Sequence, residues 1–271
     1  MCTNPVGITG MLVPCGRCIA CRIGRTSEWT TRILHELNYK DGCFVTLTYS
    51  NENEPAGRTL VKEHLQLFFK RLRKYLKPKR IKYFSCGEYG DEGERPHYHA
   101  IVMGWRPDLE SCYKPNRKQL VSREIEKLWS FGYNTIGHPD REAIQYVVGY
   151  VRKKLYGVRA EEYGIRLAPF QLQSIGIGKE YAMEHKEQIL SERGITRNGV
   201  NVGLPRYYRK KLIEKGSAEE FVYHERCKVK RDQLKYQYED YHDYKDAYWS
   251  DNGRRKKQNE ARESLFKKGS I

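Results

Sequence analysis

Two histidines separated by a single residue, His97 and His99, are the side chains of this 271-residue chain best suited to bind a metal ion together. Pro96 before them favours extended backbone, and the apolar residues 100–103 after them predict that the segment continues as a β-strand. Alternate side chains of a strand point to the same face, so both imidazoles can bind one divalent ion.

A third ligand is expected from the segment that precedes the histidines. Residues 81–86 predict a strand, and the glycine-rich residues 87–93 predict the hairpin connection that follows it, so Glu88 should lie across from the histidines. Glu92 and Glu94 are alternatives on the same segment. Three protein ligands leave positions open for phosphate oxygens. Histidine ligands favour Mn²⁺ by intrinsic affinity, but the cellular abundance of each metal can favour Mg²⁺, so both ions are candidates.

Two tyrosines four residues apart, Tyr146 and Tyr150, lie in a helix predicted from about Asp140 to Leu155. On a helical wheel they fall with Lys153 and Lys154 on the side opposite the aliphatic stripe, so we expect both phenols to point away from the helix's own apolar face. A phenol with a pKa near 10 is a poor nucleophile unless cations or a metal-bound phosphate assist it, and the two lysines are candidates for the cations. A metal site with paired tyrosines predicts phosphodiester chemistry through a covalent protein intermediate.

Cysteines suggest a second metal site near the start of the chain. Cys15, Cys18 and Cys21 have the spacing C-x2-C-x2-C, and Cys2 could supply the fourth thiolate of a tetrahedral Zn²⁺ site. The alternative is that Cys18 and Cys21 are simply small buried residues at the start of a helix. Eight cysteines without a secretory signal favour thiols or metal ligands over a disulfide framework.

The composition favours a nucleic-acid partner. The chain has 50 Lys and Arg against 34 Asp and Glu, a formal net charge of +16, and 21 tyrosines. A basic surface without such a partner is the alternative. No stretch is apolar enough to span a membrane or to act as a signal peptide, so we expect no membrane association and a cytoplasmic location.

The remaining periodicity predicts an α+β protein. Helices are expected at residues 21–39, 65–76 and 122–131, and further strands at residues 43–49 and 133–136. We expect an irregular segment over residues 1–20. The predicted domains are a cysteine-rich segment with a helix (1–40), an endonuclease domain (41–208) and a charged tail, helical or disordered (209–271).

Three motifs resemble those of the HUH endonucleases that initiate rolling-circle replication, in the order Phe44-Val45-Thr46-Leu47-Thr48-Tyr49, Pro96-His97-Tyr98-His99 and Tyr146-x-x-x-Tyr150. With the cysteine cluster and Gly87-Glu88-Tyr89-Gly90, the chain is most similar to the replication initiators of gokushovirus-type microviruses, which are small single-stranded DNA phages.

This resemblance implies a central antiparallel sheet flanked by helices, of palm or ferredoxin-like topology. It implies that the histidines and a third polar residue bind Mg²⁺ or Mn²⁺, and that a tyrosine attacks an origin in single-stranded DNA to form a 5′-phosphotyrosine. The two tyrosines would alternate through successive rounds of nicking and joining. The freed 3′-OH would prime a host DNA polymerase, with a host helicase as a further partner, in the bacterial cytoplasm.

Other functions remain open from the sequence. A relaxase or transposase of the same superfamily would share the site. A non-catalytic nucleic-acid-binding protein would use the basic residues and tyrosines without cutting DNA. A metal-dependent hydrolase would use His97 and His99 without either tyrosine.

Overall fold

The computed structural model describes residues 2–3, 5–8, 11–90, 93–117, 119–153, 163–192, 194–197, 200–214, 216–217, 220, 222, 253, 257–258 and 261. Within this part of the chain two compact units form, one of Trp29–Tyr181 and the other of Met1–Glu28 with Ala182–Ile271. The predicted domain boundaries at residues 41 and 209 stay predictions.

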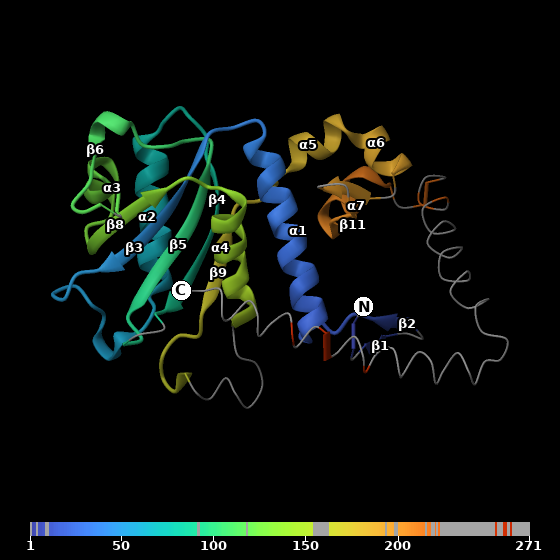
Figure 1. The fold of residues 1–271 in the computed structure, drawn as a ribbon, viewed down its shortest axis with the longest axis horizontal. Coiled ribbons are helices and arrows are strands. Elements are labelled where there is room, and N and C mark those ends of the chain that lie inside the picture. Colours follow the sequence, from blue (N-terminus) through green and yellow to red (C-terminus); the bar gives the residue numbers. More distant parts are fainter. Residues whose placement is uncertain are drawn as a thin grey trace. The chain divides into compact units, whose positions relative to one another are not determined.

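A five-stranded antiparallel sheet organises the unit Trp29–Tyr181, which is therefore α+β as predicted (Figure 1). Its strand order is β8-β3-β5-β4-β9, with the bounds β8 Gly132–Gly137, β3 Gly42–Tyr49, β5 Pro96–Met103, β4 Lys82–Tyr89 and β9 Phe170–Gln173. The strand with the two histidines, β5, is therefore the central one, and it is paired along its whole length with β4 and along nearly all of it with β3.

Helices cover both faces of this sheet because alternate strand residues are apolar on each side. On one face, α2 (Lys62–Tyr75) and α3 (Arg123–Leu128) pack over β3 and β5. On the other face, α4 (Arg141–Lys153) and the second half of α1 (Ile19–Leu37) pack over β4 and β5. The core of this second face includes Ile33, Phe84, Ile101, Met103, Ile144, Val147 and Val148.

The long predicted elements are confirmed, with two corrections. Strand β4 runs to Tyr89, although a hairpin connection was expected from Gly87 onward, because β4 and β5 stay in register for eight residue pairs. A side chain at Gly87 would meet Phe170 and Leu60 at 3.0 and 3.1 Å, so glycine here makes room for core packing rather than for a turn. The segment expected to be irregular contains a short hairpin of β1 (Val6–Ile8) and β2 (Met11–Val13).

Shorter elements complete the described chain. The sheet unit contains the 3₁₀ turns η1 (Ala56–Arg58) and η2 (Leu109–Ser111) and the small ribbon of β6 (Cys112–Tyr113) and β7 (Val121–Ser122). Helix α5 (Lys179–Glu184) spans the boundary between the units.

The other unit contains the β1–β2 hairpin, the first half of α1, and four later elements: α6 (Lys186–Ser191), β10 (Gly194–Arg197), β11 (Val200–Gly203) and α7 (Arg206–Leu212). Strands β10 and β11 form a second hairpin. Most of the predicted tail lies outside the described residues. Among the helices that are described, none is long and apolar enough to cross a lipid bilayer.

Candidate metal and tyrosine site

Glu88, His97 and His99 converge on the face of the sheet that α4 covers. Glu88 is the cross-strand partner of His97 in the β4–β5 register, as predicted. One carboxylate oxygen, Glu88 Oε1, lies 2.9 Å from His97 Nε2 and 3.1 Å from His99 Nε2. Glu88 and His99 are buried, and the His97 side chain keeps 17% of its surface exposed, so the group is open to solvent on the His97 side.

Each histidine is held by its other ring nitrogen. His97 Nδ1 lies 2.9 Å from the carbonyl oxygen of Arg95, and His99 Nδ1 lies 3.0 Å from Thr46 Oγ1. In the tautomer that donates from Nδ1, both Nε2 lone pairs point toward Glu88. Such outer contacts fix the ring orientation of metal-binding histidines.

The spacing of these three ligand atoms fits a small octahedral ion. Bonds of about 2.1 Å at right angles place neighbouring ligands about 3.0 Å apart. The two Nε2–Oε1 distances are 2.9 and 3.1 Å, and all three ligand atoms lie within 4.8 Å of one another. Three protein ligands on one side of such an ion leave its other positions for water or phosphate.

Both tyrosines of α4 face the histidines. The ring of Tyr146 meets that of His99 edge-on at a centroid distance of 5.1 Å, and the ring of Tyr150 stacks on His99 at 5.5 Å. The two tyrosine rings lie 4.7 Å apart. The spacing of four residues therefore brings both phenols to one histidine, which was expected only as a shared helix face.

The two phenols differ in exposure, and for one of them the helical wheel was wrong. Tyr146 is 38% exposed, but Tyr150 is only 6% exposed and belongs to the same apolar core as Ile144 and Val147. A wheel separates the sides of a helix but does not show that the sheet beneath α4 is wide enough to cover both. Burial, followed by the negative charge of Glu88, raises the pKa of Tyr150 well above its usual value.

Two contacts of the site were not predicted. Thr46 orients His99, and Phe44 stacks against the ring of His99 at 5.6 Å. Both side chains come from β3, and Thr46 is the cross-strand partner of His99. The alternation of residues 44, 46 and 48 carried this signal, since the strand next to a metal strand must present one of its faces to the ligands.

The other predicted residues divide into three groups. Glu94 pairs with Arg166 at 2.7 Å, and its side chain is 65% exposed, so it is not part of the group. Glu92 and Lys154 lie outside the described residues, and Lys153 is described only as the last residue of α4. Cys2, Cys15, Cys18 and Cys21 do come together, as a separate group.

Comparison with known proteins identifies relatives. Residues 42–155, which include all of Glu88, His97, His99, Tyr146 and Tyr150, match the family of the replication-associated protein ORF2. No solved structure matches the chain at a significant level.

Three curated phage proteins are similar over most of the chain. Replication-associated protein ORF2 of Spiroplasma virus 4 is 36% identical over 239 residues, covering 82% of this chain and 73% of the relative. Replication-associated protein VP4 of Bdellovibrio phage phiMH2K is 32% identical, covering 72% of this chain and 66% of the relative. Replication-associated protein ORF4 of Chlamydia phage 1 is 30% identical, covering 76% and 55%, respectively.

Proposed function

The chain belongs to the ORF2 family of replication-associated proteins, and on this premise we propose that it initiates replication of a small phage genome by nicking and rejoining single-stranded DNA. The observation that carries the proposal is the meeting of two tyrosine rings and two histidines with one buried carboxylate. The same constellation without tyrosines would suit a plain metal nuclease.

Glu88, His97 and His99 are the proposed ligands of Mg²⁺ or Mn²⁺. When bound, the ion would neutralise charge on the scissile phosphate and polarise its oxygens. The protein's own part is to hold the three ligand atoms at the required separation through Arg95, Thr46 and the β4–β5 register.

Tyr146 is the proposed first nucleophile because it is the more exposed phenol and still lies against His99. Its oxygen would form a bond to phosphorus as the bond from phosphorus to the 3′ oxygen breaks. The phenol loses its proton and the departing 3′ oxygen gains one, so the products are a free 3′-OH and a 5′-phosphate on Tyr146.

Tyr150 is the proposed second nucleophile, acting once Tyr146 carries DNA. A buried phenol with a raised pKa stays protonated until a nearby cation or a rearrangement favours its ionisation. The proposed cations are Lys153 and Lys154. Reversal of the first step, with a 3′-OH attacking the phosphotyrosine, would rejoin the strand.

The proposed partners follow from this chemistry. A free 3′-OH on an origin strand is the primer that a host DNA polymerase extends, and a helicase would separate the strands ahead of it. The protein would therefore act inside the host bacterium.

The decisive experiment is incubation of labelled circular single-stranded phage DNA with the full chain and Mn²⁺ or Mg²⁺, followed by a denaturing gel and peptide mass spectrometry. We expect a DNA adduct on Tyr146 that is lost with EDTA and in His97→Ala. Tyr75→Phe, at an exposed tyrosine of α2, is the matched control and should form the adduct normally.

Two outcomes would contradict the proposal. Cleavage without an adduct would indicate a metal nuclease that does not use a tyrosine. Tight, salt-sensitive binding without cleavage on several candidate origins would indicate a binding protein.

A further inference from the structure

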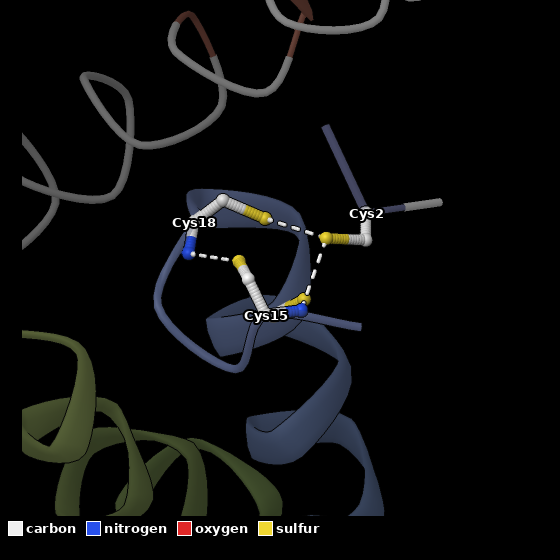
Figure 2. A group of neighbouring side chains, drawn as sticks. Cys2, Cys15 and Cys18 are labelled. Atoms are coloured by element: carbon white, nitrogen blue, oxygen red, sulfur yellow. Dashed lines mark hydrogen bonds between the residues drawn. The ribbon is translucent and has the colours of Figure 1, made fainter. Parts of the chain in front are cut away.

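Four cysteine side chains of the first 21 residues form a compact group that has no part in the proposed nicking chemistry. The sulfur atoms of Cys2, Cys15, Cys18 and Cys21 all lie within 4.8 Å of one another. Figure 2 shows three of them, with Cys2 facing both Cys15 and Cys18 from the opposite side of the group. The four residues come from the start of the chain and from the turn that leads into α1.

The sulfur spacing distinguishes a single metal ion from a disulfide. A tetrahedral ion with bonds of about 2.3 Å holds its sulfur ligands about 3.8 Å apart, whereas a disulfide bond is about 2.05 Å long. The Cys18 and Cys2 sulfurs are 3.8 Å apart, and all four cysteines are free thiols. An iron–sulfur cluster places several metal atoms between its cysteines and would separate them further.

Backbone amides point at the sulfurs, as is expected around thiolates. Cys15 Sγ accepts hydrogen bonds from the amides of Arg17 at 3.4 Å and Cys18 at 3.3 Å. Cys2 Sγ accepts one from the amide of Cys15 at 3.3 Å. Gly16, with φ of 73°, provides the left-handed conformation that turns these amides back toward Cys15. Such hydrogen bonds orient ligands and stabilise their negative charge.

Positive charge is also close at hand. Four thiolates and one divalent ion carry a net charge of −2. Arg17, Arg22 and Arg25 alternate with the cysteines in the sequence, and the Arg25 guanidinium comes within 3.6 Å of the position that a side chain at Gly16 would occupy.

Apolar packing contributes little to the order of this segment. Among the residues from Pro5 to Cys18 whose exposure the structure describes, none is buried, and Val6 in the hairpin is 49% exposed. An isolated two-stranded hairpin is marginally stable at best, and small units of this kind are usually held by a metal or by disulfides.

We propose that Cys2, Cys15, Cys18 and Cys21 bind one structural Zn²⁺ ion, which ties the start of the chain to the first turn of α1. All four ligands are protein side chains, so the ion has no open position for substrate and its role is structural. This inference is independent of the proposed nicking reaction.

The test is the metal content of the full chain purified without added metal. We expect about one Zn²⁺ per chain, retained in Glu88→Gln and in the control Cys112→Ser, and lost in Cys18→Ser. Replacement by Co²⁺ should give thiolate-to-metal charge-transfer absorption in the wild type, which reports sulfur ligation even if Cys18→Ser fails to fold. Absence of zinc, zinc retained in Cys18→Ser, or Co²⁺ spectra without thiolate bands would each overturn the proposal.

The strand register carries a second inference, which rests on the proposed function. Tyr133 of the edge strand β8 pairs with Thr48, Thr48 pairs with His97, and His97 pairs with Glu88. Directly paired residues share one face, so Tyr133 lies on the same face as the metal ligands, two strands and about 10 Å from His97. It is 66% exposed.

We infer that Tyr133 stacks on a base of the single strand beside the reacting phosphate. An exposed aromatic ring on a ligand-bearing face is suited to this because every base has a π face. The neighbouring exposed positions of this face, including Tyr146, would extend the surface toward the nucleophile.

The test is the affinity for a fluorescent single-stranded oligonucleotide measured with EDTA present. Tyr133→Ala should weaken binding by roughly 5- to 150-fold, while Tyr133→Phe and the control Tyr75→Ala should bind as the wild type does. Equal binding by Tyr133→Ala overturns the inference. Weaker binding together with a wild type that forms no adduct would retain the stacking role but contradict the nicking reaction.

Discussion

Two pairs of tyrosines lie on opposite faces of the same sheet, and only one pair is placed for chemistry. On the face covered by α2, the hydroxyls of Tyr49 and Tyr98 are 2.7 Å apart and neither ring is exposed. On the face covered by α4, Tyr146 and Tyr150 lie against His99, and Tyr146 is partly exposed.

The difference lies in the partners of the hydroxyl groups. Tyr98 donates to the carbonyl of Val61 and accepts from the amide of Val61, while Tyr49 bonds both Tyr98 and His64. This network anchors β3 and β5 to the start of α2, so both phenols are structural. A tyrosine becomes a candidate nucleophile only where one side of its hydroxyl stays accessible and a metal site lies beside it.

The largest expected effect comes from removing the hydroxyls on one face. Tyr146→Phe with Tyr150→Phe should lower adduct formation by on the order of a thousandfold or more, because no nucleophile remains. Tyr49→Phe, which removes a hydroxyl from the other face, should leave the adduct intact in folded protein. The measurement is the labelled-DNA gel, and equal loss in both proteins would erase the distinction between the faces.

Metal binding should affect only the face that α4 covers. At a hundredfold excess over its dissociation constant, Mn²⁺ should raise the free energy of unfolding of the wild type by about 2.7 kcal/mol. Thermal unfolding should show this shift in Tyr49→Phe as well but not in Glu88→Gln, which lacks the carboxylate. A full Mn²⁺ shift in Glu88→Gln would remove Glu88 from the ligand set.

Tyr98→Phe tests the structural pair. Its hydroxyl satisfies Tyr49 and both backbone groups of Val61, so its loss should lower the free energy of unfolding by about 1–3 kcal/mol. Denaturant unfolding measures this loss. Adduct formation should persist well below the melting temperature, and a variant that is stable but unable to nick would assign Tyr98 a role beyond structure.

The smallest effect is a change of slope at alkaline pH. Burial raises the pKa of Tyr49 and of Tyr98 above the usual value near 10. The unfolded chain therefore loses these protons first, so the stabilising contribution is complete below about pH 10 and is lost above it at about 1.4 kcal/mol per pH unit for each phenol.

Tyr49→Phe removes one such group, and its free energy of unfolding should fall less steeply above pH 10 than that of the wild type. Tyr150→Phe should do the same, since burial also raises the pKa of Tyr150, whereas the control Tyr75→Ala tests an exposed position. An unchanged slope in Tyr49→Phe would show that this phenol is not kept protonated by the fold.

Local periodicity predicted most of the candidate site. The alternation of His97 and His99 requires only a strand, and the place of Glu88 requires only that two consecutive strands form a hairpin. The end of β4 was missed because Gly87 is a turn residue in most sequences, and its true role depends on Phe170, which is distant in the chain.

Tertiary structure decided what periodicity could not. The exposure of Tyr150 depends on the sheet face that receives α4, and the contact of Thr46 with His99 depends on which strand pairs with β5. The grouping of Cys2 with three cysteines thirteen or more residues away likewise depends on the path of the chain through a hairpin.

Strand β5 places the candidate ligands and the structural tyrosine network on neighbouring residues, His97, Tyr98 and His99. Inserting or deleting one residue here would exchange the two faces, moving the histidines into the core and Tyr98 toward α4. Substitutions affect one face at a time, but a change in length affects both. During phage evolution the spacing within β5 should therefore vary less than the identity of its individual residues, and length variants are expected to accumulate in loops instead.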